Sequence, residues 1–143
     1  MIKFFICLIF VTTFISCNKC NYKEIKIGSD LCEAQSYKQN RKLIKIIDLI
    51  LIKDKEGLIK MSTYDCGGGA GCYDLGSVLA QTIGKVGENN FIKMCSQLDE
   101  NQKSEIYSLL EAGFEYGDIN NDGKMDDSSL EKNYPKISDE LNN

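Results

Sequence analysis

The residues best suited to do chemistry form one short acidic segment, GDINNDGKMDDSS, at residues 117–129. Oxygen-bearing side chains recur in it at every second position, and Gly123 falls where a loop must turn sharply. Ca²⁺ takes about six to eight oxygen ligands from a flexible loop of this kind. The same Asp, Asn and Gly residues also favour tight turns on their own account. The segment therefore predicts either a calcium site or an acidic turn between two helices.

The spacing resembles the calcium loop of EF-hand and dockerin-like proteins across residues 118–126. This resemblance implies a weak Ca²⁺ site with a structural role, because position 12 of the loop, normally acidic, is Ser129. The expected Kd is about 10⁻⁴–10⁻³ M, the range of extracellular modules. The resemblance also implies that the Met125 side chain faces the core. The implied ligands are Asp118, Asn120, Asp122, the carbonyl oxygen of Lys124, and Asp126.

The composition argues against an enzyme. The chain contains no histidine, which removes Ser-His and Cys-His nucleophile pairs and histidine-containing metal sites. Glu111 and Glu115 lie one helical turn apart, but this spacing is more typical of a solvated helix face than of an acid–base pair. We predict a non-enzymatic protein with no small-molecule substrate. A hydrolase that uses Asp65 or Glu111 is the enzymatic alternative.

The first 17 residues have the pattern of an export signal. Lys3 precedes an apolar run over residues 4–15 that is too short to span a bilayer comfortably. The run ends in Phe14-Ile15-Ser16-Cys17, which resembles a bacterial lipobox, although Phe14 stands where Leu is usual. The resemblance implies that residues 1–16 are a signal peptide and that lipid on Cys17 anchors the domain to a membrane, in the periplasm or at the cell surface. An uncleaved signal anchor and a plain secreted protein are the alternatives.

Export predicts an oxidising environment and therefore disulfides. With Cys7 removed and Cys17 lipidated, an odd number of cysteines remains, so at least one stays free or pairs outside the chain. Cys66 and Cys72 flank a glycine-rich loop, and we predict that they pair. A second bridge could join Cys20 to Cys32 or Cys32 to Cys95. The spacing of the cysteines does not suit zinc.

The elements that must position these residues are predicted to be helical. After a polar tether over residues 17–29, with an extended piece at 22–27, residues 30–143 read as one small domain. Its fold class is all-α, an irregular or orthogonal bundle of five to seven short, disulfide-stapled helices. A buried strand is the alternative within residues 39–53. The expected helices span residues 30–37, 39–53, 58–64, 75–86, 90–98, 100–116 and 130–134, with a last turn at 136–141.

The charge distribution indicates the kind of partner. The formal net charge of −4 argues against nucleic acid. Residues 18–60 carry ten Lys or Arg against six Asp or Glu, whereas residues 111–143 carry three against nine. The acidic C-terminal region predicts a basic protein partner, and one specific version is an immunity protein that neutralises a toxin delivered into the periplasm. The alternative is a calcium-binding envelope module with a structural or sensor role.

Overall fold

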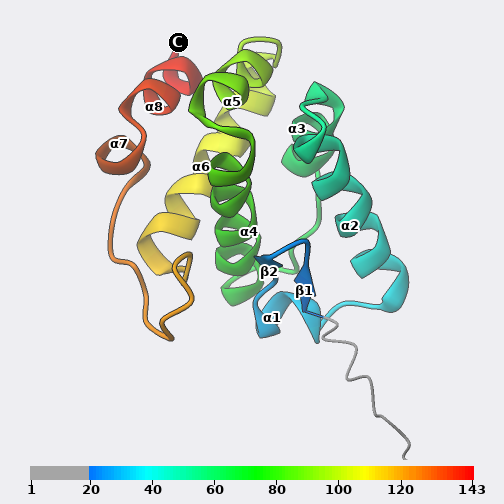
Figure 1. Ribbon diagram of the computed structural model, residues 1–143. Helices are drawn as coiled ribbons and strands as arrows, with labels where there is room; N and C mark the ends of the chain where they lie inside the picture. Colours follow the sequence, from blue (N-terminus) through cyan, green and yellow to red (C-terminus); the bar gives the residue numbers. More distant parts are fainter. Residues whose placement is uncertain (1–19) are drawn as a thin grey trace, which may run out of the picture.

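The computed structural model describes residues 20–143, which form eight helices and one two-stranded hairpin (Figure 1). The fold is all-α, as predicted. Residues 1–16 and Cys17, the predicted signal peptide and lipidation site, lie outside the described residues. No helix within residues 20–143 is long and apolar enough to cross a membrane. The elements are β1 Asn21–Tyr22, β2 Ile25–Lys26, α1 Ser29–Cys32, α2 Tyr37–Leu51, α3 Lys55–Ser62, α4 Ala70–Val86, α5 Glu88–Cys95, α6 Glu100–Tyr116, α7 Leu130–Asn133 and α8 Pro135–Asn142.

Several helices begin where local capping chemistry predicts. Asp99 accepts the backbone N–H of Gln102 and the Gln102 side chain accepts the N–H of Asp99, a capping box that starts α6 at the predicted residue. Ser36 and Gln39 form the same motif before α2, which is a helix rather than the alternative strand. The Ser129 hydroxyl caps α7 by accepting the N–H of Lys132. These starts need only residues three apart in the chain.

Helix α4 begins at Ala70, earlier than the sequence predicts. The helix expected over residues 75–86 would have Asp74 as its N-cap, the residue just before its first turn. Asp74 instead lies inside α4, and its Oδ2 accepts the N–H of Leu31 in α1, 3.0 Å away. Gly28 makes room for this contact, because a Cβ there would collide with the Asp74 carboxylate. The carboxylate therefore caps a neighbouring helix rather than its own.

Helix α4 runs through the centre of the molecule, with α6 on one side and α2 on the other (Figure 1). Its Leu75, Val78, Leu79 and Ile83 are fully buried. The backbones of α4 and α6 touch at Gly76 and Gly113, where a Cβ on Gly76 would lie 2.6 Å from the Gly113 nitrogen. This crossing fixes the C-terminal end of α6, from which the acidic segment departs.

The segment expected to be a polar tether enters the fold. Residues 21–26 form an antiparallel hairpin in which Tyr22 pairs with Ile25. Ile25 and Ile27 are completely or almost completely buried. The side chain of Gln81 in α4 bonds both the N–H and the carbonyl of Lys26, each at 2.9 Å. The chain is therefore held against α4 from its first described residues.

Two disulfides staple the described residues. Cys66 pairs with Cys72, as predicted, across the glycine-rich loop before α4. The second bridge joins Cys20 to Cys32, the first of the two predicted alternatives. Cys95 at the end of α5 is buried and free. Burial raises the pKa of its thiol to about 12, so this cysteine behaves as a small core residue.

Candidate functional site

The acidic segment leaves α6 at Tyr116 and returns to the protein before α7. Two backbone hydrogen bonds fix its ends. The N–H of Asp126 donates to the carbonyl of Gly117 at 2.9 Å, and the N–H of Ser128 donates to the carbonyl of Phe114 at 3.0 Å. The segment is thus a closed loop on the end of α6.

The first predicted calcium ligands turn into this loop and bond its backbone. Asp118 Oδ1 accepts the N–H of Asp122 at 2.9 Å, and Asp118 Oδ2 accepts the N–H of Gly123 at 3.1 Å. Asn120 Oδ1 accepts the same Asp122 N–H at 2.9 Å. Asn121 and Gly123 have φ angles of 61° and 84°, the left-handed conformation that Asn and Gly tolerate best. This is the geometry of an Asx-rich turn.

The remaining predicted ligands are bonded in the same way. Asp122 Oδ1 accepts the N–H of Lys124 at 2.9 Å. Asp126 Oδ2 accepts the N–H of Ile119 at 2.6 Å and so reaches back across the loop. Within residues 20–143, no three His, Cys, Asp or Glu side chains gather closely enough to hold a metal ion. An ionised carboxylate has about four lone-pair sites, so these hydrogen bonds do not prevent the same side chains from binding Ca²⁺.

The expectation that Met125 faces the core is wrong. Its side chain is 66 % exposed, while Ile119 is half-buried and packs against the core from the same loop. The Asp126 carboxylate turns inward to the Ile119 N–H, and the residue before it is left facing solvent. An apolar side chain is thus presented among carboxylates.

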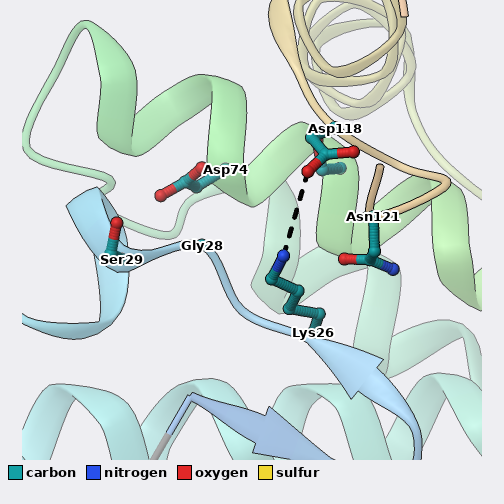
Figure 2. A pocket seen from close by; sticks show the side chains of 7 residues that line it. Lys26, Gly28, Ser29, Asp74, Asp118 and Asn121 are labelled. Atoms are coloured by element: carbon teal, nitrogen blue, oxygen red, sulfur yellow. Dashed lines mark ion pairs between the residues drawn. The ribbon is translucent and has the colours of Figure 1, made fainter. Parts of the chain in front are cut away.

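A small polar cavity separates this loop from α1 and α4 (Figure 2). Its volume is about 160 Å³. The Lys26 ammonium lies 3.8 Å from Asp118 Oδ2, and burial raises the pKa of Asp74. The lining residues are Lys26, Gly28, Ser29, Asp74, Ser77, Asp118 and Asn121.

Sequence reasoning assigned no role to Lys26 or Ser77. The Ser77 hydroxyl is buried without a protein partner, on a residue that is 6 % exposed. It packs against Gly117, where a Cβ would collide with it. These residues come from three distant segments, so no local pattern joins them.

An aromatic pair, one ring half-buried and the other exposed, lies beside the loop. The rings of Tyr73 and Tyr116 are 4.8 Å apart between centroids and tilted by 35°. Tyr116 is 42 % exposed, and the neighbouring Glu115 carboxylate raises the pKa of its phenol. We define residues 115–127 as the acidic surface. It exposes Tyr116 and Met125 together with Lys124 and three carboxylates, those of Glu115, Asp122 and Asp127. The carboxylates of Asp118 and Asp126 are half-buried and turned into the loop.

The carboxylates considered for catalysis have structural partners. Glu111 Oε1 accepts the N–H of Leu130 at 3.0 Å and so caps α7 from α6. Asp65 Oδ1 accepts the N–H of Gly67 at 2.9 Å in the disulfide loop. Gly67, Gly68 and Gly69 all have positive φ angles, the reason this loop is built of glycine.

Comparison of the chain with models of known protein families, with curated proteins and with solved structures finds no match. The surfaces just described are therefore the basis for a functional proposal.

Proposed function

We propose that this chain is an exported, lipid-anchored bacterial protein that acts without catalysis, by binding a basic protein through the acidic surface. The observation that carries the proposal is the exposure of Tyr116 and Met125 in a segment of five carboxylates, three of which are exposed. Tyr and Met are enriched in protein interfaces, where aromatic anchors supply much of the affinity. Surrounding charges of one sign steer a partner of the opposite sign and raise the association rate.

The local backbone also suits binding. The hydrogen bonds from Asp126 to Gly117 and from Ser128 to Phe114 hold the loop, and the turn inside it is closed by its own side chains. A loop that is already fixed loses less conformational entropy when a partner binds. The acidic surface is therefore preorganised for recognition.

The proposed location rests on the lipobox and on the disulfides. Two cystine bridges in so small a domain are typical of an oxidising compartment. Cys17 is three residues before Cys20, the first residue that the fold holds covalently. Lipid on Cys17 would keep the domain at the membrane surface, where delivered toxins arrive. The specific version that we favour is an immunity protein, by analogy with other small, exported, disulfide-bonded helical proteins.

The proposal is tested by photo-crosslinking in living cells. In one variant a photoreactive residue replaces Met125. In a second variant of the same chain it replaces Lys93, an exposed position on α5. We expect one dominant protein adduct at position 125, with a basic partner, and none at position 93. The immunity version further expects that the partner is a toxin encoded beside this gene and that expression of the chain protects cells from it.

A pair of charge variants controls the experiment. Asp122→Asn/Asp127→Asn removes two charges from the acidic surface, and Asn keeps the oxygen that accepts the Lys124 N–H and tolerates the positive φ of residue 127. Glu100→Gln/Asp139→Asn removes two exposed charges elsewhere. The first variant should weaken the adduct and the second should not. The proposal would be refuted if the two charge variants gave equal amounts of adduct at position 125, or if position 93 gave as much adduct as position 125.

Calcium binding is the second candidate, favoured by the convergence of Asp118 and Asn120 on one N–H inside the loop. Calorimetric titration of residues 18–143 with Ca²⁺ tests it. We expect weak binding, with a Kd of about 10⁻⁴–10⁻³ M, lost in Asp118→Ala/Asp122→Ala. Melting curves with Ca²⁺ and with EDTA would then show whether the ion stabilises the fold. If no heat of binding is measured at millimolar Ca²⁺, the segment is an acidic turn and not a calcium site.

A further inference from the structure

A second charged surface lies on α2, and its sign is opposite. Lys38, Arg41, Lys42 and Lys45 are all exposed and follow the i, i+3, i+4, i+7 spacing of one helix face. Tyr37, at the start of the same face, is 77 % exposed. No acidic residue occurs between positions 34 and 47. We call these five residues the basic stripe.

The basic stripe is open and partly organised by aromatic rings. With Gln39, its residues line one shallow hollow of about 670 Å³. The Arg41 guanidinium lies 5.8 Å from the centre of the Tyr37 ring, and the Lys42 ammonium lies 5.6 Å from that of Tyr64. No salt bridge involves a residue of the stripe among the described residues. Its charges are therefore free to meet an anionic partner.

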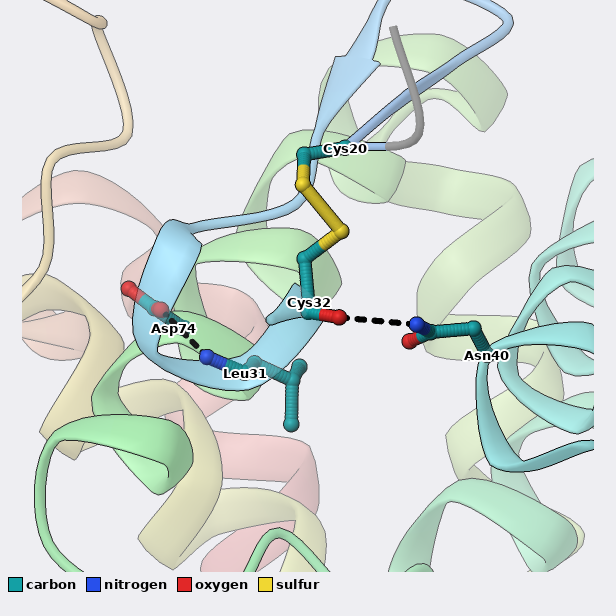
Figure 3. Close-up of a disulfide and its surroundings, with 5 residues drawn as sticks. All are labelled: Cys20, Leu31, Cys32, Asn40 and Asp74. Atoms are coloured by element: carbon teal, nitrogen blue, oxygen red, sulfur yellow. Dashed lines mark hydrogen bonds between the residues drawn. A yellow bond between two sulfur atoms is a disulfide. The ribbon is translucent and has the colours of Figure 1, made fainter. Parts of the chain in front are cut away.

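The chain enters the fold next to the N-terminal part of α2, the helix that carries the stripe on its exposed face (Figure 3). The disulfide joins Cys20 to Cys32, and the carbonyl of Cys32 accepts a 2.8 Å hydrogen bond from the side-chain amide of Asn40. Asn40 is in the first turns of α2, next to Arg41. One covalent bridge and one hydrogen bond thus connect the first described residue to the helix that carries the basic charges.

We propose that the basic stripe docks on the anionic headgroups of the bilayer to which Cys17 is anchored. The proposal rests on the lipid anchor of the proposed function. Three residue steps separate Cys17 from Cys20, which gives an extended reach of about 10 Å. This reach equals the Debye length of about 10 Å at 0.1 M salt. The anchor therefore keeps Cys20, and with it the start of α2, close to the membrane surface, where anionic lipid attracts polybasic segments strongly.

Charge segregation gives the docked protein an orientation. The full chain has a net charge of −4, and the mature chain, which lacks Lys3, has −5, so an anionic membrane would repel it if its charges were evenly mixed. The acidic surface, however, lies at the end of α6, and α4 separates α6 from α2 (Figure 1). Docking through the stripe therefore does not use the acidic surface, which is left to bind a protein partner. Tyr37 then lies at the level of the headgroups, where an amphipathic ring is favoured.

Vesicle co-sedimentation tests this with the mature chain lacking Cys17, residues 18–143, which contains every described element. The vesicles are phosphatidylcholine, with or without phosphatidylglycerol. Lys38→Gln/Arg41→Gln/Lys45→Gln removes three charges from the stripe. Lys93→Gln/Lys132→Gln/Lys136→Gln removes three exposed charges from α5, α7 and α8 and is the matched control. Circular dichroism melting checks that both variants fold.

We expect the unmodified chain to bind only the anionic vesicles, and more weakly as salt rises. One Lys or Arg near an anionic surface contributes about fivefold in affinity, so the stripe variant should bind at least ~10-fold more weakly at low salt. The control should bind within about twofold of the unmodified chain. Equal losses in the two variants, or equal binding to neutral vesicles, would overturn the proposal.

This measurement is independent of the lipid anchor and of the protein partner. The free chain needs neither to meet a vesicle, so failure here leaves the acidic surface untouched. The lipid anchor is tested separately, by growing cells with radiolabelled fatty acid. If the chain carries no label that is lost when Cys17 is replaced, the anchor itself is refuted. With the anchor in place, docking should shield Lys38 and Lys45 from an amine-reactive reagent on anionic vesicles, while Lys93 stays reactive.

Discussion

The contact between α4 and α6 makes a sharp prediction about stability, because it positions both Tyr73 and Tyr116. Gly76→Ala places a methyl group 2.6 Å from the Gly113 nitrogen and 2.8 Å from its Cα. These neighbours are backbone atoms, so neither can rotate away, and the helices must separate by about 1 Å. Overpacking of this kind typically costs about 1–3 kcal/mol.

Gly84→Ala is the matched control in the same helix, because a Cβ at position 84 meets nothing within 4 Å. In an open helical position this substitution should stabilise by about 0.5–1 kcal/mol. Gly76→Ala gains the same helix propensity, but the free-energy cost of its collision with α6 is larger than this gain. The two variants should therefore differ by at least about 1–3 kcal/mol in the free energy of unfolding, with Gly76→Ala the less stable.

Urea denaturation followed by circular dichroism measures this difference, as a lower midpoint for Gly76→Ala with an unchanged m-value. Partner crosslinking at position 125 should weaken together with stability, since the crossing holds the end of α6. Equal midpoints for the two variants, or a higher midpoint for Gly76→Ala, would refute the tight helix contact.

Three further predictions concern the core and its links. The buried Cys95 thiol, with its pKa raised to about 12, should not react with iodoacetamide in the native protein and should react fully in denaturant; rapid native labelling would contradict its burial. Cys20→Ser/Cys32→Ser opens a loop of sequence separation 12, and should lower the free energy of unfolding by about 3 kcal/mol in urea titrations; an unchanged midpoint would mean that the bridge does not constrain the chain. Burial raises the pKa of Asp74, so the folded state binds its proton more tightly than the unfolded state does, and its contribution to stability falls as pH rises above the unfolded value of about 3.9. Asp74→Asn should therefore gain stability relative to the native protein as the pH rises above about 3.9, and a pH-independent difference would count against this.

Local signals predicted most of the helices. The span of α6 follows from the capping box at Asp99 and from apolar residues at helical spacing, and both signals lie within the helix or next to it. The start of α4 was missed because the Asp74 side chain is used by α1, more than forty residues earlier. A side chain's capping partner depends on which groups are near in space, and no local pattern contains that information.

The candidate site divides in the same way. The turn chemistry of residues 118–126 is local, so sequence identified both the loop and its Asx-rich character. The exposure of Met125 was not foreseen, because it depends on which loop residue reaches the core, and Ile119 takes that place. The cavity with Lys26 and Ser77 was also missed, since it exists only where the hairpin, α4 and the loop meet.

The two charged surfaces also have consequences for one another. An anionic bilayer attracts basic proteins and so raises their concentration near its surface. In the proposed arrangement a tether of about 10 Å would keep the acidic surface near that layer, whereas an untethered mature domain, with a net charge of −5 after Lys3 is removed, would be driven out of it. The basic stripe on α2 offsets this repulsion, and the carboxylates of residues 115–127 remain available to a basic partner. In this proposal, a net-negative protein captures a basic partner at a negative surface because its own positive charges are gathered on α2, apart from the carboxylates of residues 115–127.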